Sequence, residues 1–101
     1  MSRSPLTSKQ RAHLRSLSHE LDPVVRVGKE GLTEPVVQAT REAFNTRELV
    51  KVRVLDAATE GIREVGEHLA DQIDDTMLVQ VIGSIVLLFR RHPEDPVIEL
   101  P

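Results

Sequence analysis

Hydrophobic residues recur with helical spacing in three segments of the chain and form alternating or continuous apolar runs in four others. The first helix is expected to begin at Thr7, because Thr7 and Gln10 have the spacing of a capping box. It should end before Pro23, since a proline disfavours helical backbone in the residue that precedes it. Its inner face is expected to carry Gln10, Leu14, Leu17 and Leu21.

Two further helices are predicted downstream. Thr33 can cap the second helix, with Pro35 tolerated in its first turn. The third should run from about Ala58 to Ile73 and show a row of acidic residues to water. The inner positions are expected to be Val36, Thr40, Ala43 and Phe44 in the second helix and Ile62, Val65, Leu69 and Ile73 in the third.

Four strands complete the pattern. Within residues 49–55 the valines face one way while Lys51 and Arg53 face the other, which is typical of a half-exposed strand. The last two strands are separated by Gly83 and Ser84, and glycine in the first of these positions suits a type II′ hairpin turn. The strands are expected at residues 24–27, 49–55, 78–82 and 85–90.

This order of elements predicts the sheet. Strand–helix–strand units cross over right-handed to give parallel neighbours, whereas the terminal hairpin is antiparallel. The fold class is therefore α/β: an α-β-α-β-α-β-β chain in which three helices cover a four-stranded mixed sheet. We expect a single domain over residues 1–101, with residues 1–5 and 92–101 as possible tails.

The composition and motifs of the chain exclude several kinds of functional site. The chain has no cysteine, which excludes disulfides, cysteine nucleophiles and thiolate metal sites. Its four histidines lack metal-ligand spacing, and no nucleotide-binding or hydrolase motif occurs. We therefore expect no metal, no cofactor, no small-molecule substrate and no enzymatic activity. No apolar run is long enough to span a bilayer, so we expect a cytoplasmic protein without membrane contact.

Charge is distributed unevenly along the chain, whose net charge is -3. Residues 1–53 contain 10 Lys and Arg against 6 Asp and Glu, whereas residues 54–101 contain 3 against 10. Between positions 56 and 75, seven acids accompany one base, Arg63. Because local potential matters more than net charge for steering a polyanion, one basic and one acidic face can coexist.

The segment Val27-Gly28-Lys29-Glu30-Gly31-Leu32-Thr33 lies between a predicted strand and a helix start. Two glycines three positions apart let a ligand approach the backbone, and a helix N-terminus attracts phosphate. Lys29 adds a positive charge, whereas Glu30 repels phosphate unless it points away. The arrangement predicts a grip on the sugar-phosphate backbone of RNA, as in KH-type GxxG loops. The alternative is that both glycines only form a tight turn into a capped helix.

The hypothesis also includes basic residues of the first helix and of the second predicted strand, at residues 49–55. Their alternative role is that of an ordinary solvated charged face. Aromatic residues make up only 2% of the chain, so recognition of RNA backbone and shape is expected in place of base stacking. The predicted RNA-binding residues are Gly28, Lys29, Glu30, Gly31, Thr33, Lys9, Arg11, Arg15, Lys51 and Arg53.

Four stretches of the chain resemble the bacterial YhbY family, the stand-alone form of the CRM domain (chloroplast RNA splicing and ribosome maturation). They are LTSKQRAHLRSLSHELDPVVRVGKEGLTEPVV, RELVKVRV, QVIGSIVLLFR and VIELP. The resemblance implies a fold similar to the C-terminal domain of the third bacterial translation initiation factor. It also implies RNA binding and association with precursors of the large ribosomal subunit. The family's glycine loop maps onto Gly28, Lys29, Glu30 and Gly31, and its basic first helix onto Lys9, Arg11 and Arg15.

Two functional hypotheses follow. The first is a monomeric RNA-binding factor for assembly of the large ribosomal subunit, with ribosomal RNA or a precursor particle as its partner. The second is a protein-interaction adaptor that docks a basic ribosomal protein on the acidic face of the third helix. The acids that would carry this second role are Glu60, Glu64, Glu67 and Asp71.

Overall fold

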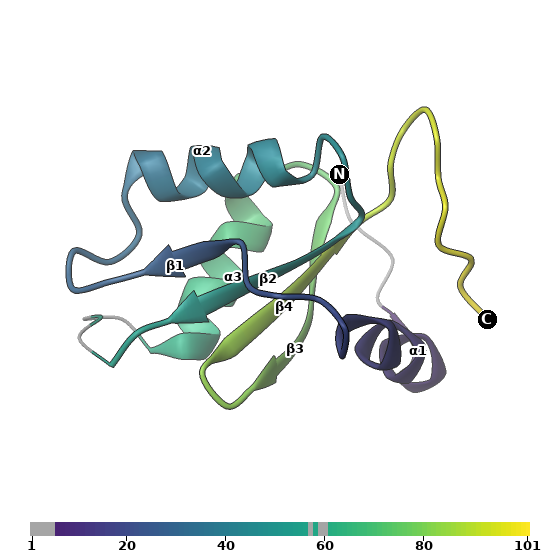
Figure 1. The fold of residues 1–101 in the computed structure, drawn as a ribbon, viewed down its shortest axis with the longest axis horizontal. Helices are drawn as coiled ribbons and strands as arrows, with labels where there is room; N and C mark the ends of the chain where they lie inside the picture. The colour runs from purple at the N-terminus through teal and green to yellow at the C-terminus, as the bar shows by residue number, and fades with distance from the viewer. Residues whose placement is uncertain (1–5, 57, 59–60) are drawn as a thin grey trace.

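The computed structural model describes residues 6–56, 58 and 61–101. Within these residues, three helices and four strands follow one another in the order that the sequence predicts (Figure 1). They are α1 (Ser8–Ser18), β1 (Val25–Val27), α2 (Glu34–Ala43), β2 (Leu49–Val54), α3 (Ile62–Gln72), β3 (Thr76–Ile82) and β4 (Ile85–Arg90). The possible tail at residues 1–5 lies outside the described part of the chain.

The strands form one mixed sheet in the order β1-β2-β4-β3, so that β1 and β3 are its edges. β1 is parallel to β2, and the other two pairs are antiparallel, as predicted. Gly83 in the β3–β4 turn has a φ of 59°, the positive value that a type II′ turn requires at this position. The register of β3 against β4 shifts between Leu78 and Gln80, and this bulge turns Val79 toward the same side as Gln80.

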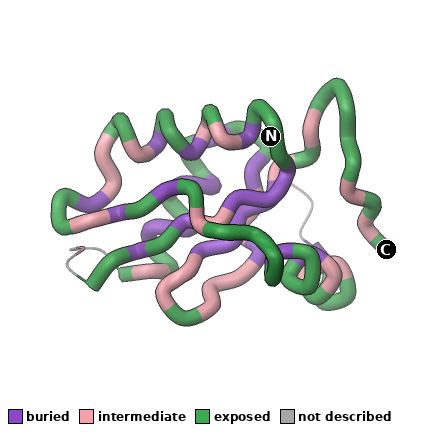
Figure 2. Tube along the Cα trace, viewed as in Figure 1, coloured by how far each residue is buried: buried purple, intermediate pink, exposed green. Residues whose placement is uncertain are grey.

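Helices cover both sides of the sheet. α2 and α3 pack on one side, and α1 and the C-terminal segment cover part of the other, hereafter the α1 face (Figures 1 and 2). Alternation along the strands supplies one core per side, because successive side chains point to opposite faces. The core beneath α2 and α3 contains Val25, Val27, Val50, Val52, Val54, Val86 and Leu88 from the strands, and the core beneath α1 contains Leu49, Val79, Leu87 and Phe89.

The first helix begins as predicted but ends early. The Thr7 hydroxyl accepts the Gln10 backbone N–H at 3.1 Å, and the Gln10 side chain accepts the Thr7 N–H at 3.0 Å. The helix then stops at Ser18, four residues short of Asp22, and Leu14 and Ser18 form its buried side. The prediction that Leu17 and Leu21 are buried is wrong, since they are 40% and 39% exposed.

These two leucines instead line an open groove between α1 and the C-terminal segment. Leu17 faces away from the side of the helix that Leu14 and Ser18 bury, because neighbouring helical positions point in different directions. Leu21 lies beyond the helix end. Val24 was predicted in the first strand but precedes β1 and is also exposed. The groove has a volume of about 950 Å³ and exposes Leu17, Leu21, Val24 and Val97.

Smaller differences concern α2, α3 and β3. In α2, Thr40 and Phe44 are buried as predicted and Val36 and Ala43 are partly buried against the core, while Val37, which was not predicted, is also buried. α3 begins at Ile62, after Gly61, whose N–H is accepted by the Glu64 carboxylate at 3.0 Å. The helix was predicted to begin at about Ala58, which is described and is not helical, and residues 59 and 60 lie outside the described residues. β3 begins two residues earlier than predicted, at Thr76.

The segment after β4 forms neither helix nor strand, yet it is held in place by a buried carboxylate. Glu48 is 5% exposed, and its side chain accepts the backbone N–H groups of His92 at 2.8 Å, Val97 at 3.1 Å and Ile98 at 2.7 Å. Burial by itself raises the pKa of Glu48, but these three hydrogen bonds and the nearby Arg91 charge outweigh it and lower the pKa below its ordinary value. The segment is therefore pinned to the domain.

Candidate nucleic-acid interface

The two glycines of the predicted loop have different structural roles. The Gly31 N–H donates to the Gly28 carbonyl oxygen at 2.9 Å and closes a four-residue turn whose central residues, Lys29 and Glu30, are exposed. Gly31 has a φ of 73°, a conformation that favours glycine. Gly28 does not have a positive φ, and a Cβ atom built on it meets no atom within 4 Å. The turn therefore requires Gly31, whereas the fold does not require Gly28.

The N-terminus of α2 offers less to a phosphate than the sequence indicates. The Thr33 hydroxyl caps the helix by accepting the Val36 N–H at 3.4 Å, and Pro35 has no N–H to donate. The acidic side chain of Glu34 is exposed in the first turn and offsets the positive end of the helix dipole. Positive charge at this loop consequently comes from Lys29.

Two backbone hydrogen bonds place the basic residue Arg53 at the same end of the sheet as this turn. The Leu55 N–H donates to the Val27 carbonyl at 2.9 Å, and the Val54 N–H donates to the Ser84 carbonyl at 2.8 Å. The end of β1, the end of β2 and the β3–β4 hairpin are thereby joined. Arg53, one residue before the end of β2, is exposed on the α1 face.

Lys51, the other basic residue predicted on this strand, has a structural partner. Its ammonium group donates to the Leu21 carbonyl at 2.9 Å, and its own carbonyl accepts the Val24 N–H at 3.1 Å. These contacts fix the connection from α1 to β1 against β2. Lys51 is half-buried and is less available to a ligand than Arg53.

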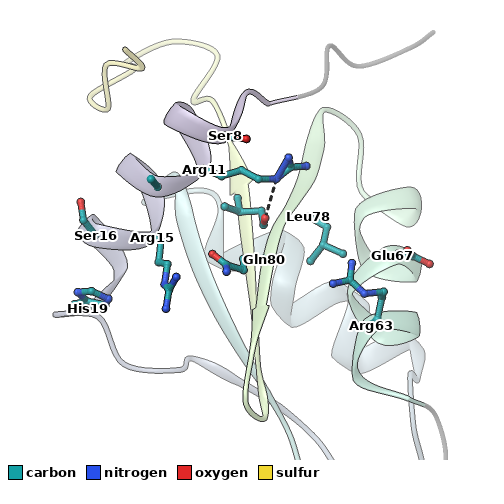
Figure 3. Close-up of a pocket in the computed structure, with 11 residues that line it drawn as sticks. Ser8, Arg11, Arg15, Ser16, His19, Arg63, Glu67, Leu78 and Gln80 are labelled. Atoms are coloured by element: carbon teal, nitrogen blue, oxygen red, sulfur yellow. Dashed lines mark hydrogen bonds between the residues drawn. The ribbon is translucent and has the colours of Figure 1, made fainter.

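The basic side of α1 lines a second feature, a groove of about 880 Å³ along the β3 edge of the sheet (Figure 3). α1 forms one wall, β3 the floor and α3 the other wall. Arg11 donates to the carbonyl oxygens of Val79 and Leu6, both at 3.1 Å, so it ties α1 to the edge strand. The groove is lined by Ser8, Arg11, Ala12, Arg15, Ser16, His19, Arg63, Glu67, Leu78, Val79 and Gln80.

Two arginines on opposite walls of this groove are available to a ligand. Arg15 of α1 and Arg63 of α3 are both exposed, and neither side chain has a partner among the residues that the structure describes. In Figure 3 the Arg63 guanidinium points toward β3 and Leu78. Arg63 was not predicted as a binding residue, because it stands among acidic residues in the sequence and belongs to no motif. Lys9 is exposed on α1 but does not line the groove.

The fold separates most of the charges that the sequence places in its two halves. α3 covers the side of the sheet opposite α1 and carries the exposed acids Glu64 and Asp71, whereas Glu67 lines the groove together with Arg15 and Arg63. The basic residues of α1 and β2 lie on or beside the α1 face. A net charge of -3 is thus compatible with a basic surface. Glu60 lies outside the described residues, and the adaptor hypothesis stays a prediction.

The sequence pattern of the CRS1 / YhbY (CRM) domain family matches residues 6–90, which span the glycine turn and all seven elements described above. The chain belongs to this family. The CRM chain is 40% identical over 96 residues to "Probable RNA-binding protein YqeI" of Bacillus subtilis, a match that covers 95% of this chain and 99% of that protein. It is 38% identical over 96 residues to "RNA-binding protein" of Haemophilus influenzae, covering 95% of each chain.

A solved structure agrees with the CRM fold. The solution structure of protein SAV1595 from Staphylococcus aureus superimposes with a TM-score of 0.80 at 39% sequence identity, covering 96% of this chain and 100% of that one. The three-helix, four-stranded mixed fold is therefore confirmed. Similarity to the C-terminal domain of the translation initiation factor stays a prediction.

Within the described residues, no group of three or more His, Asp or Glu side chains is arranged to hold a metal ion. None of the helices in this part of the chain is long and apolar enough to cross a membrane.

Proposed function

We propose that this CRM-domain protein binds RNA through the sugar-phosphate backbone at the Gly28–Gly31 turn and assists assembly of the large ribosomal subunit. The observation that carries the proposal is the open space at Gly28 beside the exposed side chain of Lys29. The relatives named as RNA-binding proteins support the RNA partner. The assembly role rests on the family resemblance. The proposal also includes a monomeric, cytoplasmic state and the absence of catalysis, which are expectations from the sequence.

The physical basis is close approach combined with charge. A phosphate can approach the main chain at Gly28 because no side chain intervenes, and the Lys29 ammonium can neutralise it. Phe44 and Phe89, the two aromatic residues of the chain, are 3% and 1% exposed and cannot stack on bases. Recognition should therefore depend on RNA backbone and shape more than on sequence.

Reversing the charge of Lys29 tests the proposal. Binding of ribosomal RNA by the wild type should weaken on the order of tenfold or more between 50 and 200 mM salt, because bound phosphates release counterions. Lys29→Asp should reduce affinity on the order of tenfold at 100 mM salt, measured by fluorescence titration. The control is Arg47→Asp, which changes net charge equally at an exposed residue outside the turn. Equal affinity in the two variants would contradict a grip at the turn.

Substituting Gly28 tests the close approach separately from charge. Gly28→Val should leave the unfolding temperature almost unchanged, because the position is open and its φ is not positive. It should weaken RNA binding, since the new methyl groups occupy the space through which a phosphate approaches the backbone. The two measurements are thermal unfolding and RNA titration. A folded variant that binds like the wild type would leave the glycines as turn residues only.

The assembly role needs its own measurement in cells. Tagged protein should co-sediment with precursors of the large ribosomal subunit, and Lys29→Asp should move it toward the top of the gradient. A wild-type protein that binds RNA in vitro but is absent from these particles would overturn the assembly role and leave RNA binding intact.

A further inference from the structure

Parallel pairing of β1 with β2 brings two arginines together. In the register of this pair, Arg26 lies directly opposite Arg53. Neighbouring strands are about 4.8 Å apart, so the two backbone positions are close. The flanking residues Val25, Val27, Val52 and Val54 are buried beneath α2 and α3, so both arginines point to the α1 face. Both are exposed.

The positive charges of this pair are not neutralised by any of the residues that the structure describes. Among the described residues, neither arginine side chain has a hydrogen-bond or ion-pair partner. Like charges directly opposite each other on one face of a sheet are destabilising. An anion placed between them or over them would remove this repulsion and gain two charge-assisted contacts.

The surroundings of the pair fit a nucleic-acid strand. Arg26 is two residues before Gly28, so it is about 7 Å along the chain from the open position of the turn. On the other side, Arg53 pairs with Ile85 and Ile85 pairs with Ile82. A single row, Arg26-Arg53-Ile85-Ile82, therefore crosses all four strands. The isoleucines are half-buried and offer an apolar surface beside the charges.

We infer that Arg26 and Arg53 together bind phosphate groups of the RNA backbone and carry the RNA from the Gly28–Gly31 turn onto the open part of the α1 face. This inference rests on the proposed function and extends it. It assigns a ligand to Arg26, a residue that the sequence alone did not single out. It also gives the RNA a direction across the sheet, from the β1 edge toward β3.

The test is the double variant Arg26→Gln with Arg53→Gln, titrated with ribosomal RNA over a range of salt concentrations. Affinity at low salt should fall on the order of tenfold. The slope of log affinity against log salt should decrease in magnitude by at least about 0.7, the value for one lost phosphate contact on a single strand. The matched control, Arg47→Gln with Arg91→Gln, removes two exposed arginines elsewhere and should keep the wild-type slope.

Thermal unfolding of the free protein separates binding from folding. Because the double substitution removes a like-charge pair, the variant should unfold at the same temperature as the wild type or slightly above it. A loss of binding together with unchanged or increased stability supports the inference. A lower unfolding temperature with an unchanged salt slope would show a structural role and overturn it.

The two proposals fail in different ways. If Lys29→Asp weakens binding but the double variant binds like the wild type with the same slope, the role of the arginine pair is overturned and the proposed function stands. If the wild type itself does not bind RNA, the proposed function fails and the inference fails with it.

Discussion

Gly66→Val is expected to destabilise the protein by about 2 to 3 kcal/mol, the upper part of the range for overpacking a core. Gly66 is buried in α3 where the helix crosses the sheet. A Cβ atom at this position lies 2.9 Å from a Leu78 methyl carbon and 3.0 Å from a Val86 methyl carbon. The gain in helix propensity from replacing glycine is less than about 1 kcal/mol and does not compensate.

The size of the substituent should decide the outcome at Gly66. The contacting Leu78 methyl is the far end of a flexible side chain, whereas Val86 is β-branched and stiff. Gly66→Ala makes the same two Cβ contacts but lacks the further methyl groups of valine, and the gain in helix propensity partly offsets the clash, so it should stay within about 1 kcal/mol of the wild type. Urea unfolding of both variants measures the difference. Equal stability of Gly66→Val and the wild type would mean that α3 shifts away from β3 and β4 without cost.

The same substitution at Gly28 is the matched control. Gly28→Val should lose RNA affinity and keep stability, whereas Gly66→Val should lose stability. The contrast follows from the surroundings, since the added atoms meet open space at Gly28 and packed side chains at Gly66.

Glu48→Ala is expected to destabilise the protein by about 2 to 3 kcal/mol and to release the C-terminal segment. The substitution removes the acceptor for three backbone N–H groups, at His92, Val97 and Ile98. Hydrogen bonds to a charged group contribute about 1.5 to 3 kcal/mol each, but the released amides can bond to water, which limits the loss. Release would also uncover the core beneath α1, against which Ile98 and Leu100 pack.

Acidity should produce the same effect in the wild type. The pKa of Glu48 is lowered in the folded state, so the carboxylate contributes stability above the ordinary pKa that it has in the unfolded chain and loses that contribution as the pH falls through the folded value. Glu48→Gln keeps one acceptor oxygen and should show an intermediate loss at neutral pH, without the part of the acid dependence that Glu48 supplies.

Amide hydrogen exchange and urea unfolding between pH 3 and 7 measure both effects. In the wild type, the protection factors of the Val97 and Ile98 amides, taken relative to the intrinsic exchange rate at each pH, should be high near neutral pH and fall in acid. In Glu48→Ala these protection factors should be low at every pH. Protection of these amides in the alanine variant would show that apolar packing alone holds the segment.

Several features followed from local sequence and were confirmed. The Thr7 and Gln10 cap, the hairpin at Gly83 and the alternation in β2 each depend on neighbouring residues, which is why they can be predicted without the fold. The predicted inner face of the first helix was partly wrong. Leu17 lies within the helix but faces the groove, away from the side that Leu14 and Ser18 bury. Leu21 lies beyond the helix end at Ser18, and helix boundaries are poorly encoded in local sequence.

The element order, the mixed sheet, the family and the loop at residues 28–31 could all be predicted from sequence patterns. Which cations are available to a ligand could not be predicted in this way. Arg11 and Lys51 bond to backbone carbonyls of distant residues, whereas strand register sets Arg26 beside Arg53. Packing of α3 at the β3 edge brings Arg63 to the groove that Arg15 lines. The reason is that a side chain's partners come from segments far apart in the chain, and only the folded structure brings those segments together.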